Sequence, residues 1–269
     1  MNLSVEIKGK GFPILCLHGH PGSGRSLSVF TNHLSQRFQT LAPDLRGYGK
    51  SRTQGNFQMS DHLVDLTELL DRYNIEQCLL LGWSLGGILA LELVLKNPQR
   101  FKGLILIASA ARPRSSHPPV SWQDLLSTGV AGILNTIKPG WRWNIEVFGK
   151  RSLFRYLLQQ QTPLAYHYLA SDGVPAYLQT SNAAQKALFQ SLQAGYNRLE
   201  DLAKIDIPCL ILAGAEDRHI TAQSSQETAQ YLQNCNWKCY PNTAHLFPWE
   251  IPDRVLTDID SWLEINFEF

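Results

Sequence analysis

A glycine-rich hexapeptide at residues 82–87, Gly-Trp-Ser-Leu-Gly-Gly, lies between two apolar runs and constrains this chain more than any other feature. The run before it, 78–81, has the length of a buried strand, and the run after it, 88–95, suits a buried helix. A strand that turns at once into a helix brings two backbones together, which residues without side chains permit. The hexapeptide therefore predicts a sharp strand–turn–helix unit with Ser84 at the turn.

Ser84 is the central residue of a Gly-x-Ser-x-Gly pattern, which is typical of a nucleophile elbow. A serine at the head of a helix projects its hydroxyl beside free backbone N–H groups that can stabilise an oxyanion. The same pentapeptide also fits an ordinary glycine-rich turn, because short motifs match by accident. A catalytic interpretation therefore needs a base and a carboxylate elsewhere in the chain.

Short apolar strands alternate with amphipathic helices along most of the chain, which predicts the α/β class. Repeated β–α units imply right-handed crossovers and a mostly parallel sheet with helices on both faces. The near-continuous Val, Ile and Leu content of the central strands is typical of strands covered on both sides. Strands are expected at 3–8, 13–17, 40–43, 78–81, 103–108, 207–213 and 236–240.

The alternation stops after residue 111 and resumes at 199, which predicts two parts. Residues 1–111 and 199–269 are expected to form the α/β core, and 112–198 an inserted helical cap or lid. Ligand sites of open α/β sheets lie at the carboxyl ends of the strands, so we expect the lid there. Helices in the insertion are expected at 121–137, 144–160, 162–170 and 182–195.

Two downstream loops offer the partners that a serine nucleophile needs. Asp217 follows the buried strand 207–213, and His245 lies between the last strand and the last helix. A weak hydroxyl nucleophile needs a general base, and the base needs an orienting carboxylate. We therefore predict Asp217 as the acid and His245 as the base, with Glu216 and His219 as weaker neighbours of the acid.

The turn after an early strand, residues 18–24, is also glycine-rich and is expected to complete an oxyanion hole. The predicted donors are the backbone N–H groups of His20 and Leu85. His18 and His20 have no carboxylate companion at metal-type spacing, so we expect no metal and no cofactor.

The charge balance is uneven along the chain. The formal net charge is +1, which gives no reason to expect nucleic acid as a partner. Residues 112–200 hold nine Lys or Arg and four Asp or Glu, a balance of +5. This segment is either a docking face for an anionic partner or a set of solvated helix faces.

Composition also bears on location and assembly. No apolar run reaches eighteen residues, so we expect no membrane span. Five scattered cysteines argue against a disulfide framework and favour a reducing compartment, which we take as the cytoplasm. We expect a monomer or a weak homodimer.

Five segments together carry a family resemblance: 18–22, 44–51, 82–87, 214–217 and His245. In this order they resemble the α/β-hydrolase superfamily across 1–111 and 199–269. The resemblance implies an eight-stranded, mostly parallel sheet and a triad of Ser84, Asp217 and His245. The hexapeptide is similar to the elbow of the pimeloyl-ACP methyl ester carboxylesterases of biotin synthesis, although that subgroup tends to have Trp where His20 stands here.

The expected activity is hydrolysis of a carboxylic ester through an acyl-enzyme on Ser84. The substrate would be a small or medium acyl ester, free or linked to a carrier protein. Other activities on the same triad stay open: a C–C bond hydrolase, a lactonase or a menaquinone-pathway lyase. A receptor that uses an intact triad to sense a small molecule is a further alternative.

Overall fold

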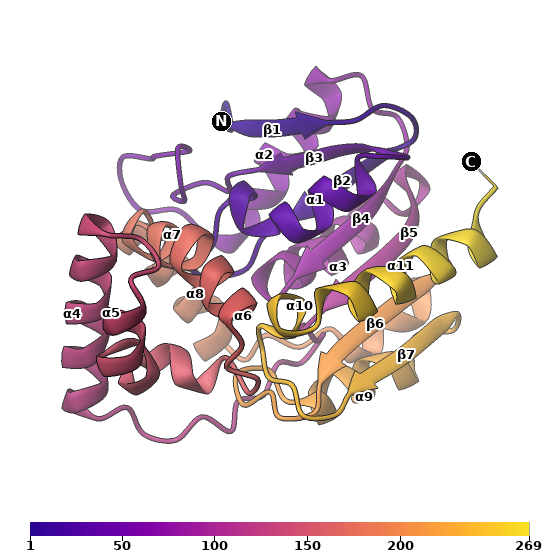
Figure 1. The fold of residues 1–269 in the computed structure, drawn as a ribbon. Helices are drawn as coiled ribbons and strands as arrows, with labels where there is room; N and C mark the ends of the chain where they lie inside the picture. Colours follow the sequence, from indigo (N-terminus) through magenta and orange to yellow (C-terminus); the bar gives the residue numbers. More distant parts are fainter. Residues whose placement is uncertain (269) are drawn as a thin grey trace.

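The computed structural model describes residues 1–268 and contains a seven-stranded sheet in the order β1-β3-β2-β4-β5-β6-β7 (Figure 1). β1 runs antiparallel to β3, and every other neighbouring pair is parallel. The α/β class and all seven expected strands are confirmed, whereas the eighth strand that the resemblance implied is absent from the described residues. The strands are β1 Val5–Lys8, β2 Pro13–Leu17, β3 Gln39–Pro43, β4 Cys78–Trp83, β5 Phe101–Ile107, β6 Cys209–Gly214 and β7 Cys235–Tyr240.

The central strands lie in the interior of the molecule. Every residue of β4 and β6 is buried, as expected for parallel strands covered by helices on both faces. The register aligns Leu15 of β2 with Leu80 of β4, and Leu80 with Leu104 of β5. This alignment brings the ends of β2, β4 and β5 to one edge of the sheet.

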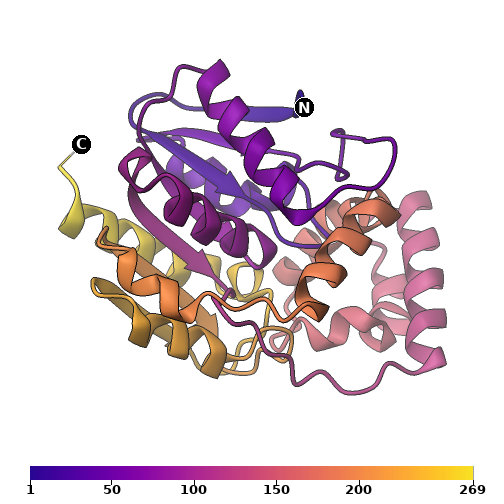
Figure 2. The same ribbon diagram turned by 180° about the vertical axis from the view of Figure 1, so that it is seen from behind.

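Two helical layers bury the two faces of the sheet. α1 (Ser28–Leu34) and α11 (Pro252–Asn266) pack with one cluster of core side chains, and α2 (Met59–Arg72) and α3 (Leu85–Lys96) pack with the other. α9 (Ala222–Tyr231) lies on the side of α3, and Figure 2 brings that face to the front. The apolar residues of each helix recur at helical spacing, so each helix buries one stripe.

The chain between β5 and β6 is helical. Its helices are α4 Trp122–Ile137, α5 Arg142–Val147, α6 Pro163–Tyr168, α7 Val174–Leu178 and α8 Asn182–Gln193. A π-helical turn at Leu169–Gly173 joins α6 to α7. Figure 1 shows this segment beside the edge of the sheet where the parallel strands end.

The expected helix at 144–160 is wrong, and the structure shows why. α5 ends at Val147, and two short 3₁₀ turns follow, at Gly149–Arg151 and Leu153–Tyr156. Ser152 has an extended backbone, and its hydroxyl accepts a hydrogen bond from the N–H of Phe154. The serine therefore caps a new turn instead of continuing the helix.

Backbone hydrogen bonds tie the helical segment to the loops that follow β3 and β7. The N–H of Ser181 donates to the carbonyl of Gly47 at 2.9 Å, and the N–H of Leu246 donates to the carbonyl of Leu157 at 2.9 Å.

Within residues 1–268, no helix has both the length and the apolar character that crossing a bilayer requires.

Candidate active site

Ser84 stands at the turn between β4 and α3 with an unusual backbone. Its φ is +54° and its ψ is −114°, a conformation that side-chain-bearing residues rarely adopt. The surroundings hold it there: its N–H donates to the carbonyl of Ile107 at 2.8 Å, and Ser109 Oγ donates to its carbonyl at 2.9 Å. The predicted strand–turn–helix unit is confirmed.

The two flanking glycines are required by close backbone approach. A Cβ on Gly86 would overlap the carbonyl oxygen of Leu17 in β2, and a Cβ on Gly82 would overlap the carbonyl oxygen of Gly86. Neither obstacle is a flexible side chain, so neither can move aside cheaply. This packing explains the glycine spacing from which the turn was predicted.

His245 and Asp217 form a buried pair. His245 Nδ1 lies 2.7 Å from Asp217 Oδ2, and each residue is 4% exposed. The second carboxylate oxygen, Oδ1, accepts hydrogen bonds from the backbone N–H groups of His219 at 2.7 Å and Ile220 at 3.0 Å. With Nδ1 engaged by the carboxylate, only Nε2 of His245 is left to face a hydroxyl.

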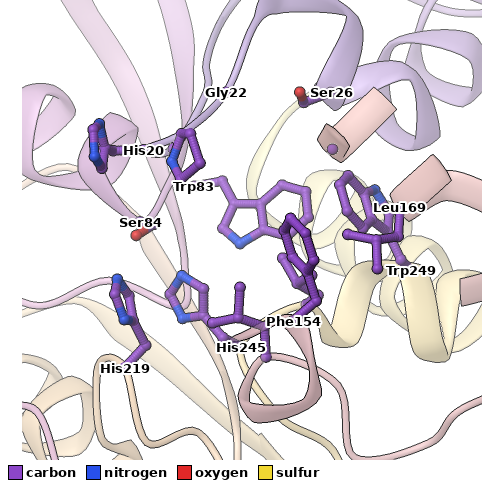
Figure 3. A pocket seen from close by; sticks show the side chains of 15 residues that line it. His20, Gly22, Ser26, Trp83, Ser84, Phe154, Leu169, His219, His245 and Trp249 are labelled. Atoms are coloured by element: carbon purple, nitrogen blue, oxygen red, sulfur yellow. The ribbon is translucent and has the colours of Figure 1, made fainter. Parts of the chain in front are cut away.

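Ser84, His245 and His219 line the same cavity, although they come from three different loops. Figure 3 shows His245 and His219 side by side on one side of Ser84, with His20 on the other. The structure thus brings together the residues predicted from the sequence as nucleophile, acid and base. Their catalytic roles remain predictions.

Glu250 is a buried carboxylate that sequence reasoning missed. Its Oε1 accepts the N–H of Ala244 at 2.9 Å, and its Oε2 accepts the N–H of Gln160 at 2.6 Å. Burial raises the pKa of this carboxyl group above its ordinary value. The side chain ties the loop that carries His245 to the helical segment, and its one sequence signal is an isolated carboxylate after the apolar run 246–249.

The turn after β2 passes over Ser84. A Cβ placed on Gly19 would lie 3.2 Å from the Ser84 Cβ, so the backbone of this turn reaches the serine directly. Leu85 begins α3, where the first N–H groups of a helix have no acceptor within the helix. The structure therefore places both predicted oxyanion loops, at His20 and at Leu85, next to the hydroxyl.

Two further histidines beside Ser84, His219 and His20, have lowered pKa values. Burial, and then repulsion from His245, lowers the pKa of His219 to about 3. Burial, and then His18, lowers the pKa of His20 to about 4. His20 Nδ1 lies 2.9 Å from the hydroxyl of Tyr48, and the ring of His219 is centred 4.8 Å from that of His245. These rings offer the cavity polar groups without charge.

His18 has a structural part instead. Its Nε2 accepts the N–H of Leu45 at 3.0 Å, and its Nδ1 lies 2.8 Å from the carbonyl oxygen of Gly19. Both ring nitrogens are therefore engaged in holding two loops together. No group of three or more His, Cys, Asp or Glu side chains within residues 1–268 is arranged to hold a metal ion.

The space around Ser84 is divided into two compartments of very different size. A small compartment of about 90 Å³ lies on the side of Trp83, Leu246 and Trp249. A large compartment of about 600 Å³ lies between the sheet edge and the helical segment, and mostly apolar side chains line it. Ser84 and Phe154 line both compartments, whereas His245 lines only the small one.

Comparison with known sequences identifies the family. The sequence profile of the alpha/beta hydrolase fold matches residues 13–252. The chain belongs to this family. The resemblance drawn from the five sequence segments is thereby confirmed.

Individual relatives of this α/β hydrolase are named for different reactions. It is 34% identical to the pimeloyl-[acyl-carrier protein] methyl ester esterase of Aeromonas salmonicida, over 81% of this chain and 82% of that one. The match to the esterase of that name from Aeromonas hydrophila, 38% identical, spans only 41% of this chain and 42% of the other.

Two further matches cover nearly the whole chain. The 2-hydroxymuconate semialdehyde hydrolase of Pseudomonas putida is 25% identical over 97% of this chain and 90% of that one. The structure of the enol-lactonase from Burkholderia xenovorans superposes with a TM-score of 0.75, covering 97% of this chain and 96% of that one at 18% identity. The first supports a hydrolase, and the second supports the fold.

Proposed function

We propose that this α/β hydrolase cleaves carboxylic esters through an acyl-enzyme on Ser84. The observation that carries the proposal is the buried His245–Asp217 pair, with Nδ1 and Oδ2 2.7 Å apart, because its imidazole lines the cavity that holds Ser84. An imidazole whose Nδ1 is engaged by a carboxylate is oriented to act as a base through Nε2.

In the first half of the proposed reaction, Ser84 Oγ attacks the ester carbonyl while His245 accepts its proton. Asp217 fixes the imidazole tautomer and stabilises the charged form. The backbone N–H groups of His20 and Leu85 stabilise the tetrahedral oxyanion, a contribution of about a hundredfold to a thousandfold for each donor. The protonated His245 then gives its proton to the leaving alcohol.

In the second half, His245 activates a water that attacks the acyl-enzyme. Collapse of the second tetrahedral intermediate returns the proton to Ser84 and releases the carboxylic acid. In this proposal the chain needs no metal and no cofactor, because the base, the nucleophile and the oxyanion donors all come from its own residues.

We also propose that residues 112–198 form a cap over a core made of 1–111 and 199–269. Tyr177, Phe189 and Leu192 from this segment line the large compartment, so the cap would select the acyl part of the substrate. The five cysteines are free in the structure, which supports a reducing compartment such as the cytoplasm.

The acyl group of the proposed substrate is either free or carrier-linked, and the two esterase relatives favour a carrier. The helical segment offers cations for an anionic carrier, but salt bridges already engage several: Arg112 with Glu227, Arg155 with Asp124 and Lys150 with Glu146. Among the described residues, Lys138, Arg142, Arg151 and Lys186 form no ion pair with an acidic side chain, and these four would meet the carrier.

A second candidate is hydrolysis of a carbon–carbon bond on the same three residues. It is favoured by the 2-hydroxymuconate semialdehyde hydrolase relative, because that match runs through the helical segment that lines the large compartment. In both candidates Ser84, Asp217 and His245 have the same positions, and the substrate decides between them.

A substrate panel with Ser84→Ala as the blank tests the proposal. The panel contains esters of increasing acyl length, the same acyl groups on a carrier protein, and 2-hydroxymuconate semialdehyde. We expect ester hydrolysis that falls by at least about 10³-fold in Ser84→Ala, while the exposed control Ser261→Ala keeps full activity.

The salt dependence tests the carrier. Carrier-linked esters should exceed free esters at low salt, and the advantage should shrink as salt screens the four cations. Equal hydrolysis rates for carrier-linked and free esters would contradict the proposal that the acyl group is carrier-linked. Ester turnover that survives Ser84→Ala would overturn the assignment of Ser84 as the nucleophile. Turnover of the semialdehyde alone would favour the second candidate.

A further inference from the structure

The small compartment contains two buried hydrogen-bond donors that none of the described residues satisfies. The indole nitrogens of Trp83 and Trp249 have no hydrogen-bond partner among the described residues, although the two side chains are only 4% and 3% exposed. Leaving a buried donor unpaired costs about 1–3 kcal/mol. Such groups usually meet a ligand or an ordered water.

Both tryptophans are held firmly in place. The ring of Trp83 meets Phe30 edge to face at 6.0 Å and Trp249 at 5.2 Å, and Trp249 stacks on Tyr168 at 6.0 Å. Figure 3 shows the nitrogen of Trp83 on the ring edge that faces His245 and Phe154. The donor therefore points into the space beside the base and is not free to turn away.

The position of His245 indicates which part of an ester enters this compartment. His245 lines the small compartment and not the large one. The group that the imidazole protonates is the leaving alcohol, so the alcohol belongs on the side of His245. At about 90 Å³ against about 600 Å³, this compartment is much the smaller of the two, which suits a short alcohol.

The charge of the compartment limits the chemistry of that alcohol. None of the residues that line it is Lys or Arg. Burial holds the pKa of His20 at about 4 and that of His219 at about 3, so neither is charged at neutral pH. An anionic group would be buried without a counter-charge, which is costly, whereas an uncharged oxygen would accept from an indole N–H at no such cost.

We propose that the small compartment is a binding site for a short leaving alcohol that carries an uncharged oxygen acceptor, with the Trp83 indole N–H as its donor. The substrate class is an ester of an ether-type or hydroxy-type short alcohol with an apolar acyl group in the large compartment. This assignment rests on the proposed ester hydrolysis, which determines the side of the ester that leaves.

Two octanoate esters of nearly equal size test the assignment. The 2-methoxyethyl and butyl esters differ by one oxygen in place of one methylene, and each is measured with wild type, Trp83→Phe and Trp122→Phe. Because each ester is compared with itself across variants, its intrinsic reactivity cancels. Trp122 is 70% exposed and lines neither compartment, so it is a matched control.

We expect Trp83→Phe to lower kcat/KM for the 2-methoxyethyl ester by about threefold to tenfold, the worth of one hydrogen bond. The butyl ester should change by less than about twofold, and Trp122→Phe should change neither. An equal loss for both esters would mean that Trp83 only packs, and no loss for either would mean that its N–H is unused. Both outcomes overturn the assignment.

A binding measurement separates this assignment from the activity. In ¹⁵N-labelled Ser84→Ala, 2-methoxyethanol should shift the indole N–H resonance of Trp83, whereas pentane, of the same length but without an oxygen, should leave it in place. Trp83 is native in this protein, so the result does not depend on how Trp83→Phe folds. A shift without any ester turnover in wild type would keep the site and overturn the proposed function, and turnover without a shift would do the reverse.

Discussion

The turn that carries Ser84 and the helical segment that covers it are built in opposite ways. Around the turn, backbone meets backbone so closely that Gly82 and Gly86 have no room for a methyl group. In α4 of the helical segment, a Cβ placed on Gly129 or on Gly132 would meet nothing within 4 Å. The turn at Ser84 is therefore tightly packed, whereas α4 has open space beside its glycines.

Exposure of apolar side chains follows the same division. All residues of β4 are buried, whereas α4 leaves Trp122, Leu126 and Ile137 more than half exposed. From this contrast we expect chemistry in the rigid strand-end loops and substrate selection in the helical segment. Changes at the turn should therefore affect turnover or folding, and changes in the segment should affect substrate preference.

The largest effect is expected at the carboxylate behind the base. Asp217→Asn should lower kcat by about 10⁴-fold with little change in KM, because an amide favours the wrong tautomer of His245. Steady-state kinetics on the best ester of the panel measures it, with Asp253→Asn, on the exposed start of α11, as the control. A loss smaller than tenfold would mean that Asp217 does not orient the base.

The next largest effect is on stability, when a glycine in each of the two regions is replaced by alanine, which adds one methyl group. Gly86→Ala should lower the free energy of unfolding by about 3 kcal/mol or more, because the Cβ meets the Leu17 carbonyl oxygen. Gly129→Ala should raise it by about 1 kcal/mol, because alanine favours a helix and meets nothing. Urea unfolding measures both, and similar changes in the two variants would remove the contrast between the regions.

A smaller effect is expected on the free energy of unfolding at acidic pH, and it comes from the buried side chain of His62. His62 lies against Phe57 with neither ring nitrogen hydrogen-bonded, and burial lowers its pKa to about 4. A histidine with a lowered pKa in the folded state supports folding above its ordinary pKa of about 6.5. That support is lost as the pH falls from there toward 4, because the unfolded chain binds the proton first.

Between pH 7 and pH 5, His62 should therefore contribute a loss of about 2 kcal/mol. His62→Phe should reduce the loss in free energy of unfolding between pH 7 and pH 5 by about that amount. At pH 7 the protonation of His62 should contribute little to the difference between wild type and variant. Urea midpoints at the two pH values measure it. An unchanged loss in the variant would show that His62 binds its proton as readily in the folded protein as in the unfolded chain.

The smallest effect on stability is expected in the helical segment. Phe189 lines the large compartment and is 46% exposed, so Phe189→Ala should cost less than about 1.5 kcal/mol. It should shift the preferred acyl length by a few-fold in kcat/KM. Tyr231→Ala, at 47% exposure and away from both compartments, is the matched control, and a length profile identical in both variants would remove Phe189 from substrate selection.

Several features followed from local sequence because local geometry dictates them. The strand–turn–helix unit at Ser84 was predictable from glycine spacing between apolar runs, since only such residues fit the turn. The central strands β4, β5 and β6 were predictable from short Leu- and Ile-rich runs. The helix at 144–160 was not, because Ser152 bonds to the backbone of Phe154 and starts a new turn, which periodicity does not report.

The order of residues along the chain was enough to establish the α/β class, the turn at Ser84 and the two loops that supply Asp217 and His245, because each depends on contacts within a few residues. The folded molecule was needed to show that Glu250 ties the His245 loop to the helical segment, and that the cavity is split in two. Those features, like the two unpaired indole donors, depend on side chains from distant loops meeting in space. Positions along the sequence do not reveal which distant side chains will come into contact in the folded protein.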